Sequence, residues 1–237
     1  GRTVRDPFGY SWSFRLLPYM EGGTIFDSYV SDVPVWDDKN AAAMRTPVAT
    51  YYCPSRRAPA ADRNFDNNDQ EPLVFGKAAG GDYAANAGTY FNYAPEGGRS
   101  DPKQAGPIHT FSKIRPAQVS DGLSKTFAVG ERHIPAPDSS WPATMVHTIQ
   151  GDTAFFAADT PATQFRDSYR GLASARDDRN TRKFGGEHPG LVNFVFLDGH
   201  VQGIETETDL NVLRWYSVIG DGNDPEAPTD GTDDGNS

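Results

Sequence analysis

The chain has 237 residues and a formal net charge of −10, and its hydrophobic fraction of 37% is low beside its 24 glycines and 18 prolines. An acidic chain without a clear Lys/Arg patch is a poor partner for nucleic acid or anionic lipid, because phosphate groups are held by clustered basic side chains. The 14 Phe, 10 Tyr and 4 Trp can still bury a core, so the composition predicts one folded domain with many turns and short elements.

The N-terminal part is expected to contain two short helices and a strand. Trp12, Leu16 and Tyr19 recur at helical spacing, and Pro18 is expected to end or bend that helix. Residues 41–49 favour a second short helix before a proline. Residues 48–53 are rich in β-formers and are predicted to be a strand that stops at the next proline.

The middle of the chain gives weaker signals. Residues 55–80 and 92–107 are rich in Gly, Pro, Asn and Asp and are predicted to be surface loops. Residues 82–88 are predicted to be extended, and residues 126–131 to form a strand. Residues 135–182 give no clear periodicity, and their role stays open.

The strongest local pattern is a β-hairpin near the C-terminus. Residues 191–197 are apolar on both faces, so we expect a central strand that is covered on both sides. Asp198-Gly199 favours a two-residue mirror-image turn, because glycine accepts a positive φ at little cost. Residues 200–204 return as the second strand, and residues 209–219 show helical spacing. We expect residues 1–220 to form a single globular domain and residues 221–237 an acidic tail.

Five elements, taken in order, carry a family resemblance. They are WSFRLLPYM with Glu21 (12–21), YCPS (52–55), DYAANAG (82–88), SDGLSKT to Glu131 (120–131) and the H-x9-D-G spacing from His188 to Asp198-Gly199. In these elements the chain resembles the prepilin-like bacterial family of unknown function that has an H-x9-D-G motif near its C-terminus.

That resemblance implies an α+β, pilin-like head with an antiparallel sheet, short helices and long Gly/Pro-rich loops. Such proteins look like type IV pilins and type II secretion pseudopilins, which begin with a leader and a long apolar helix. This sequence contains no such helix, so we expect the head to be anchored through a segment upstream of Gly1. The implied location is the bacterial envelope, periplasmic or at the cell surface, with other pilin-like subunits or envelope components as partners and the membrane reached only through the upstream helix.

The residues of the H-x9-D-G motif have two interpretations. His188, Asp198 and His200 could together bind a metal. An extended strand at ~3.3 Å per residue would, however, separate His188 from Asp198 by roughly 20 Å or more. We therefore expect Asp198 and Gly199 to shape the turn and His188 to organise the loop before the strand.

The other residues that could take part in catalysis do not indicate an enzyme. Cys53 is the only cysteine, which excludes an intramolecular disulfide, and we expect a small buried apolar residue. A catalytic thiol would need a histidine from elsewhere in the fold. A hydrolase built on Glu131 with His133 or His188 is the least favoured hypothesis, because no nucleophile is identifiable beside them.

Two binding hypotheses remain. Asp221, Asn223, Asp224 and Glu226 place hard oxygen ligands within six residues, and the pseudopilin resemblance implies calcium in a C-terminal loop; the alternative is a solvated acidic tail. A glycan- or solute-binding module is the alternative function, with a polysaccharide as partner. Its candidate contacts are the aromatic residues of the Gly-rich loops, Trp36, Tyr90, Tyr93 and Trp141.

Overall fold

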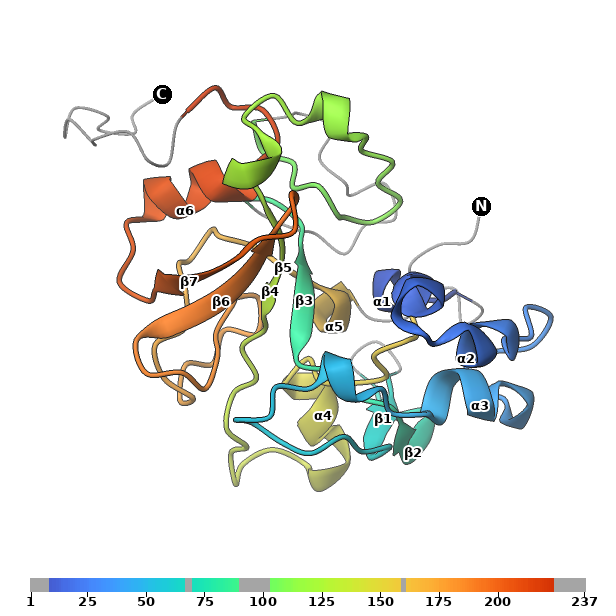
Figure 1. Ribbon diagram of the computed structural model, residues 1–237. Helices are drawn as coiled ribbons and strands as arrows, with labels where there is room; N and C mark the ends of the chain where they lie inside the picture. The colour runs from blue at the N-terminus through green and yellow to red at the C-terminus, as the bar shows by residue number, and fades with distance from the viewer. Residues whose placement is uncertain (1–8, 67–69, 90–102, 159–160, 224–237) are drawn as a thin grey trace.

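The computed structural model describes residues 9–66, 70–89, 103–158 and 161–223. The fold is α+β, with short helices and two small sheets (Figure 1). The N-terminal helices and a two-stranded hairpin lie on one side of the molecule, and a five-stranded sheet with the last helix lies on the other. None of the helices within the described ranges has the length and apolarity that crossing a bilayer requires.

The N-terminal region follows the sequence closely at its helices. Helix α1 (Trp12–Leu16) begins after Ser11, whose hydroxyl accepts a hydrogen bond from the Phe14 N–H. The chain then tightens into the 3-10 helix η1 (Leu17–Met20), with Pro18 near its start. Helices α2 (Gly23–Asp27) and α3 (Ala41–Arg45) follow, with η2 (Asp38–Asn40) between them. The helical spacing and Pro18 therefore predicted α1 and its tightening, and the short helix at Ala41–Arg45 was also expected, whereas α2 and η2 were not.

The strand predicted for residues 48–53 was wrong. Ala49–Tyr51 form the 3-10 helix η3, and the Tyr52 N–H donates to the Ala49 carbonyl. The three consecutive side chains of Tyr51, Tyr52 and Cys53 are all buried, which a half-buried strand with alternating faces does not allow. The Tyr51 hydroxyl also donates to the Ser13 carbonyl at 2.7 Å, so tertiary contacts override the β propensity.

The loop predicted for residues 55–80 contains a hairpin. Strand β1 (Arg63–Phe65) pairs antiparallel with β2 (Val74–Ala78), with an irregular register. Phe65 is fully buried and belongs to the core beneath the N-terminal helices. Too few apolar residues separate the turn residues here for periodicity to reveal the strands.

The larger sheet has the strand order β5-β3-β4-β6-β7. Its strands are Tyr83–Asn86, Phe127–Glu131, Phe165–Arg166, Leu191–Phe196 and Val201–Glu205, numbered β3 to β7 along the chain. All neighbours are antiparallel except β3 and β5, so the sheet is mixed. The remaining short helices are η4 (Pro116–Gln118), η5 (Leu123–Lys125), η6 (Ala143–Met145), α4 (Val146–Ile149) and α5 (Pro161–Gln164).

Strand β6 lies between two others, but only one of its faces is covered. Val192, Phe194 and Phe196 are buried, whereas Leu191 and Val195 are about two-fifths exposed. The expectation of burial on both faces was therefore wrong. Helix α6 (Leu210–Ser217) contributes to the buried side, where Phe194 stacks on Phe127 with ring centroids 4.0 Å apart.

The hairpin turn is longer than predicted. Strand β6 ends at Phe196 and the return strand pairs from Val201, with the Phe196 N–H donating to the His200 carbonyl. The connection therefore has three residues (197–199), with Gly199 at a φ of +93°. A turn followed by a glycine with positive φ is the usual three-residue hairpin, so the glycine was interpreted correctly and the loop length was not.

Candidate functional site

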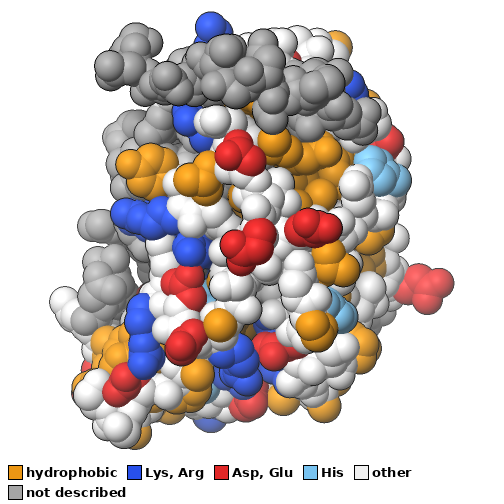
Figure 2. Space-filling view, turned by 90° about the vertical axis from the view of Figure 1, so that its left-hand side faces the viewer, with side chains coloured by type: hydrophobic (Ala, Val, Ile, Leu, Met, Phe, Trp, Pro, Cys, Tyr) orange, Lys and Arg blue, Asp and Glu red, His pale blue; other side chains and the backbone are white. Residues whose placement is uncertain are grey.

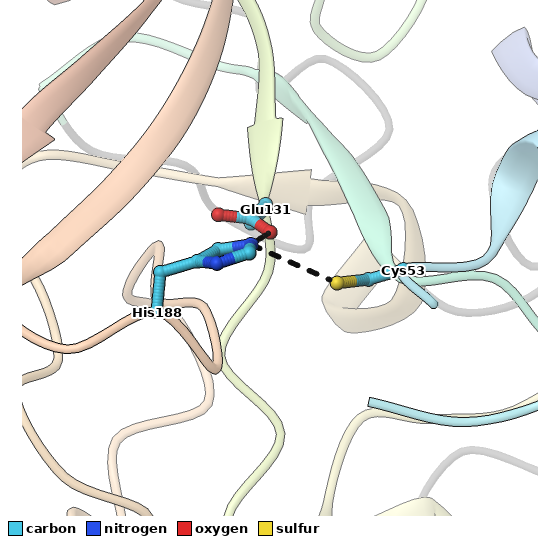
Figure 3. A group of neighbouring side chains, drawn as sticks. All are labelled: Cys53, Glu131 and His188. Atoms are coloured by element: carbon cyan, nitrogen blue, oxygen red, sulfur yellow. Dashed lines mark hydrogen bonds and ion pairs between the residues drawn. The ribbon is translucent and has the colours of Figure 1, made fainter. Parts of the chain in front are cut away.

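Three side chains from distant parts of the sequence meet at the end of strand β4. Figure 3 shows Cys53, Glu131 and His188 pointing toward one another. Glu131 Oε1 lies 3.0 Å from His188 Nε2, and Cys53 Sγ lies 3.9 Å from the same nitrogen. The sulfur, the nitrogen and a carboxylate oxygen all lie within 4.8 Å of one another. We call these residues the Cys–Glu–His cluster.

The cluster is closed on one side and open on the other. Cys53 and Glu131 are 3% and 2% exposed, whereas the His188 side chain is 35% exposed. A metal ion or small molecule can therefore reach the three atoms from the histidine side.

Glu131 is fixed in place by its neighbours. It is the last residue of β4, and its Oε2 accepts a hydrogen bond from the Asn193 N–H at 2.8 Å. A Cβ on Gly186 would lie 2.5 Å from that same Oε2, so the carboxylate needs a glycine there. One carboxylate oxygen is thus held by the backbone, and the other faces His188.

His188 is positioned by a tight turn that leads into β6. The Leu191 N–H donates to the His188 carbonyl, and Gly190 takes a φ of +71° between them. Upstream, the Gly185 N–H donates to the Glu131 carbonyl at 2.9 Å, which ties this loop to the end of β4. The glycines of the FGGEHPG segment therefore let the loop run against β4 and bring the imidazole to Glu131.

Cys53 is positioned through its backbone. Its N–H donates to Asp82 Oδ2 at 2.9 Å, and Asp82 also pairs with Arg57 at 2.7 Å.

Tyr83 is the strand partner of Glu131 on β3. Burial raises the pKa of Tyr83 to about 12, and Cys53 and Glu131 act in the same direction, so the phenol is neutral beside the cluster.

A second polar group lies next to this cluster. We call it the charge cluster; it consists of Asp82, Asp152, Arg57, Arg63 and Arg132. Asp152 is 1% exposed and Arg132 is fully buried, and Asp152 pairs with Arg57 at 2.6 Å and Arg63 at 3.1 Å. Arg132 also pairs with Asp152 and donates to the Gly151 and Thr163 carbonyls.

The pKa values in the charge cluster follow from burial and pairing. Burial alone would raise the pKa of Asp152, but the positive charges of Arg57, Arg132 and Arg63 hold it well below its usual value. Burial lowers the pKa of Arg132 to about 10, and Asp152 opposes that effect. Asp152 and Arg132 are therefore both charged at neutral pH, and the Asp152 carboxylate is paired with three guanidinium groups inside the protein.

The comparison with known families gives one match. A protein-family model described as "Protein of unknown function (DUF1559)" matches residues 1–211. The chain belongs to this family. The searches of curated proteins and of solved structures gave no match. Membership of the DUF1559 family names no activity.

The DUF1559 domain places His188 and Asp198 in separate surroundings. His188 belongs to the Cys–Glu–His cluster, whereas Asp198 Oδ1 lies 2.7 Å from His200 Nδ1 and accepts from the His200 N–H at 3.1 Å. Gly199 completes the turn between Asp198 and His200.

Glu131 and His133 also have different partners. His133 Nε2 lies 2.7 Å from the Asp178 carbonyl, and burial lowers the pKa of this imidazole. Glu131 contacts His188 instead. The histidine beside Glu131 is thus the one 57 positions further on, not the one two positions away.

The expected calcium residues lie partly outside the described ranges. The Asp221 N–H donates to Asp121 Oδ2 at 2.9 Å, and the Asn223 N–H donates to Asp221 Oδ1. Burial raises the pKa of Asp221, hydrogen bonds from Asn223 oppose the rise, and the Asp121 charge adds to it. Asp224 and Glu226 lie outside the described residues.

The aromatic residues suggested for ligand binding are scattered. Trp36 packs against the N-terminal core, and the Arg179 guanidinium lies over the Trp141 ring at 5.0 Å. Tyr90 and Tyr93 lie outside the described residues.

A cavity of about 600 Å³ lies elsewhere, beside helix α1 and residues 108–113. Its lining includes Tyr10, Trp12, Tyr29, Phe111, Arg15 and Lys113.

Sequence reasoning treated the members of the Cys–Glu–His cluster separately. Cys53 was expected to be a buried apolar residue, Glu131 to end a strand, and His188 to organise a loop. The available signal was that each belongs to a different one of the five elements that carry the family resemblance. Their meeting depends on the pairing of β4 with β6 and on the placement of residues 49–53, which the sequence pattern did not give.

Proposed function

We propose that this chain is the non-enzymatic head of an exported, pilin- or pseudopilin-like protein of a bacterial envelope. The supporting observation is that polar side chains in the elements of the family resemblance are used mainly inside the fold. The motifs then serve the architecture of a displayed domain rather than a reaction. Anchoring through a helix upstream of Gly1, and assembly with other pilin-like subunits or envelope components, are parts of the same proposal.

Three of these side chains illustrate the point. The Asn86 amide donates to the Phe127 and Ser217 carbonyls, which ties β3 to β4 and to the end of α6. Asp121 accepts from the Asp221 and Gly222 N–H groups. Asp82 holds the Cys53 backbone and pairs with Arg57. Each of these contacts satisfies the hydrogen-bonding groups of buried or turn residues, which is a structural role.

The outer surface near the hairpin suits a displayed domain. Figure 2 shows this side of the molecule, where acidic, basic and apolar side chains are interspersed. Among the exposed apolar residues, Leu191, Val195 and Val201 belong to β6 and β7, and Leu210 begins α6. Such a surface supports contacts with other proteins, whereas phosphate-bearing partners require a basic patch.

Fractionation of cells tests this proposal. The complete gene product, with a C-terminal epitope tag and its natural upstream sequence, should appear in the envelope or in material sheared from the cell surface. It should be accessible to protease added to intact cells. Recovery in the soluble cytoplasmic fraction, protected from protease, would contradict the proposal.

A solute-binding module is the second candidate, and the cavity beside α1 favours it. Phe111 lines this cavity, is 59% exposed and has a φ of +57°, which is a strained conformation for a phenylalanine. Exposed aromatic rings stack on sugar faces, and Arg15 and Lys113 would favour an anionic glycan or solute.

A glycan array with a thermal-shift screen tests this second candidate. A bound ligand should lose affinity at least about tenfold in Phe111→Ala, because the ring supplies the exposed contact. Tyr169→Ala is the control, because Tyr169 is similarly exposed (57%) but is not part of the cavity lining. Equal loss in both variants, or no ligand for the wild type, would remove this candidate.

Calcium is proposed as a cofactor of the C-terminal loop. The support is that the Asp121 carboxylate accepts the Asp221 and Gly222 N–H groups and so lies in this loop; burial raises the pKa of Asp221, and the Asp121 charge adds to that rise. Added calcium should raise the melting temperature of the wild type, and Asp121→Asn should abolish the rise. A melting temperature that calcium and chelator leave unchanged would remove the proposal.

A further inference from the structure

We propose that Cys53, Glu131 and His188 form a zinc-binding site, with three protein ligands and a fourth position open to solvent. The ligand atoms are Cys53 Sγ, Glu131 Oε1 and His188 Nε2. This inference goes beyond the proposed role as a displayed head, and its test uses the purified chain alone.

The geometry distinguishes a metal site from a nucleophilic triad. In a triad the nucleophile contacts one imidazole nitrogen, which takes its proton, and the carboxylate contacts the other nitrogen and orients the ring. Here Cys53 and Glu131 both approach Nε2. Turning the ring by 180° would present carbon Cε1 to both groups. In neither orientation do Cys53 and Glu131 contact opposite ring nitrogens.

Convergence of three donor atoms on one point is instead what a cation requires. Tetrahedral zinc with bonds of ~2.0–2.3 Å places neighbouring ligand atoms roughly 3.3–3.6 Å apart. The observed separations of 3.0 Å and 3.9 Å lie on either side of that range. Shifts of a few tenths of an ångström in the His188 side chain bring both into it, and this side chain has the room because it is partly exposed.

The donor set favours zinc over the hard cations. Calcium and magnesium take oxygen ligands, whereas a thiolate and an imidazole suit zinc. The mixture of sulfur, nitrogen and one carboxylate oxygen falls within the ligands that zinc uses. With 35% of the His188 side chain exposed, water can occupy the fourth position.

The surroundings hold the ligands as a metal site needs. The Asn193 N–H fixes the second carboxylate oxygen of Glu131, and Asp82 fixes the backbone at Cys53. Cys53 and His188 are 135 positions apart in the chain, so a bound ion cross-links three distant segments. Zinc would therefore bind at this site and also stabilise the fold of the head.

Titration of the chelator-treated chain with cobalt(II), followed by displacement with zinc, tests the site. The wild type should bind one ion per chain and show a thiolate-to-cobalt charge-transfer band, because Cys53 is the only thiol. His188→Gln and Glu131→Gln should each weaken binding at least about 100-fold and lose that band, although Cys53 is intact in both.

His200→Gln is the matched control. The His200 side chain is 40% exposed, close to the value for His188, and it contacts Asp198 outside the cluster. This variant should bind cobalt and zinc like the wild type. Circular dichroism and metal-free melting establish that each variant is folded, and His188→Gln keeps the test valid if Glu131→Gln does not fold.

Two results would overturn the proposal. One is a wild type that binds neither ion with micromolar or better affinity. The other is His188→Gln binding zinc as tightly as the wild type, or His200→Gln losing binding equally, since the ion would then lie elsewhere on the chain.

Discussion

The charge cluster around Asp152 and the Cys–Glu–His cluster are neighbours that meet water differently. Glu131 and Arg132 are adjacent in sequence, yet one side chain enters each cluster. In the charge cluster, the Asp152 carboxylate is met by three guanidinium groups and is almost fully buried. In the Cys–Glu–His cluster, three donor atoms face one another and one side remains accessible.

The difference indicates which polar groups stabilise the fold and which are available to a ligand. The Asp152 carboxylate is buried and already paired, so it is not open to a ligand, and removing it leaves uncompensated charge in the interior. An open set with converging acceptors can be completed from outside. Substitution in the charge cluster should therefore lower the unfolding free energy more than substitution in the Cys–Glu–His cluster. Added zinc should raise the unfolding free energy only through the Cys–Glu–His cluster.

The largest effect is expected from Asp152→Ala. This substitution leaves Arg132 buried without its carboxylate partner, and removing one member of a buried ion pair costs about 3–5 kcal/mol of unfolding free energy. Urea denaturation measures the loss. Asp138→Asn is the control, because the Asp138–Arg179 pair lies at the surface, and its midpoint should stay at the wild-type value. Equal midpoints for Asp152→Ala and the control would mean that the charge cluster does not hold the fold together.

Acid should weaken the charge cluster next. Because the pKa of Asp152 is held below its unfolded value of about 3.9, its contribution is complete above that pH and is lost as the pH falls toward the folded value. Below about pH 4, the unfolding free energy of the wild type should fall more steeply than that of Asp152→Asn, by up to about 1.4 kcal/mol per pH unit. Parallel pH profiles for the two proteins would show that Asp152 does not titrate in this way.

The smallest effect is expected from His188→Gln in the metal-free protein. The imidazole is partly exposed and its removal opens no cavity in the core, so the unfolding free energy should change by about 1 kcal/mol or less. A loss as large as that of Asp152→Ala would place His188 in the structural framework and erase the distinction between the two clusters.

The sequence predicted those features that depend on neighbours along the chain. The spacing of Trp12 and Leu16 with a proline close behind indicated the first helix, and the run 191–197 followed by Asp198-Gly199 indicated the hairpin. These features follow from local propensity, side-chain periodicity and the positive φ of glycine.

What the sequence did not predict depends on distant contacts. Residues 49–51 form a 3-10 helix against their β propensity, because the consecutive side chains of residues 51–53 are all buried. The outward face of β6 is apolar in sequence but partly exposed, since periodicity alone does not say what covers a face. Predicting the site would have required the strand order of the larger sheet. No local pattern indicates that β4 lies beside β6, or that Cys53 lies at the end of β4.

Equilibrium unfolding of the wild type and of His188→Gln, each with and without zinc, tests the distinction between the clusters most directly. Zinc at a hundred times its dissociation constant should raise the unfolding free energy of the wild type by about 2.7 kcal/mol and leave His188→Gln unchanged. An equal rise in both proteins, or none in the wild type, would contradict the account.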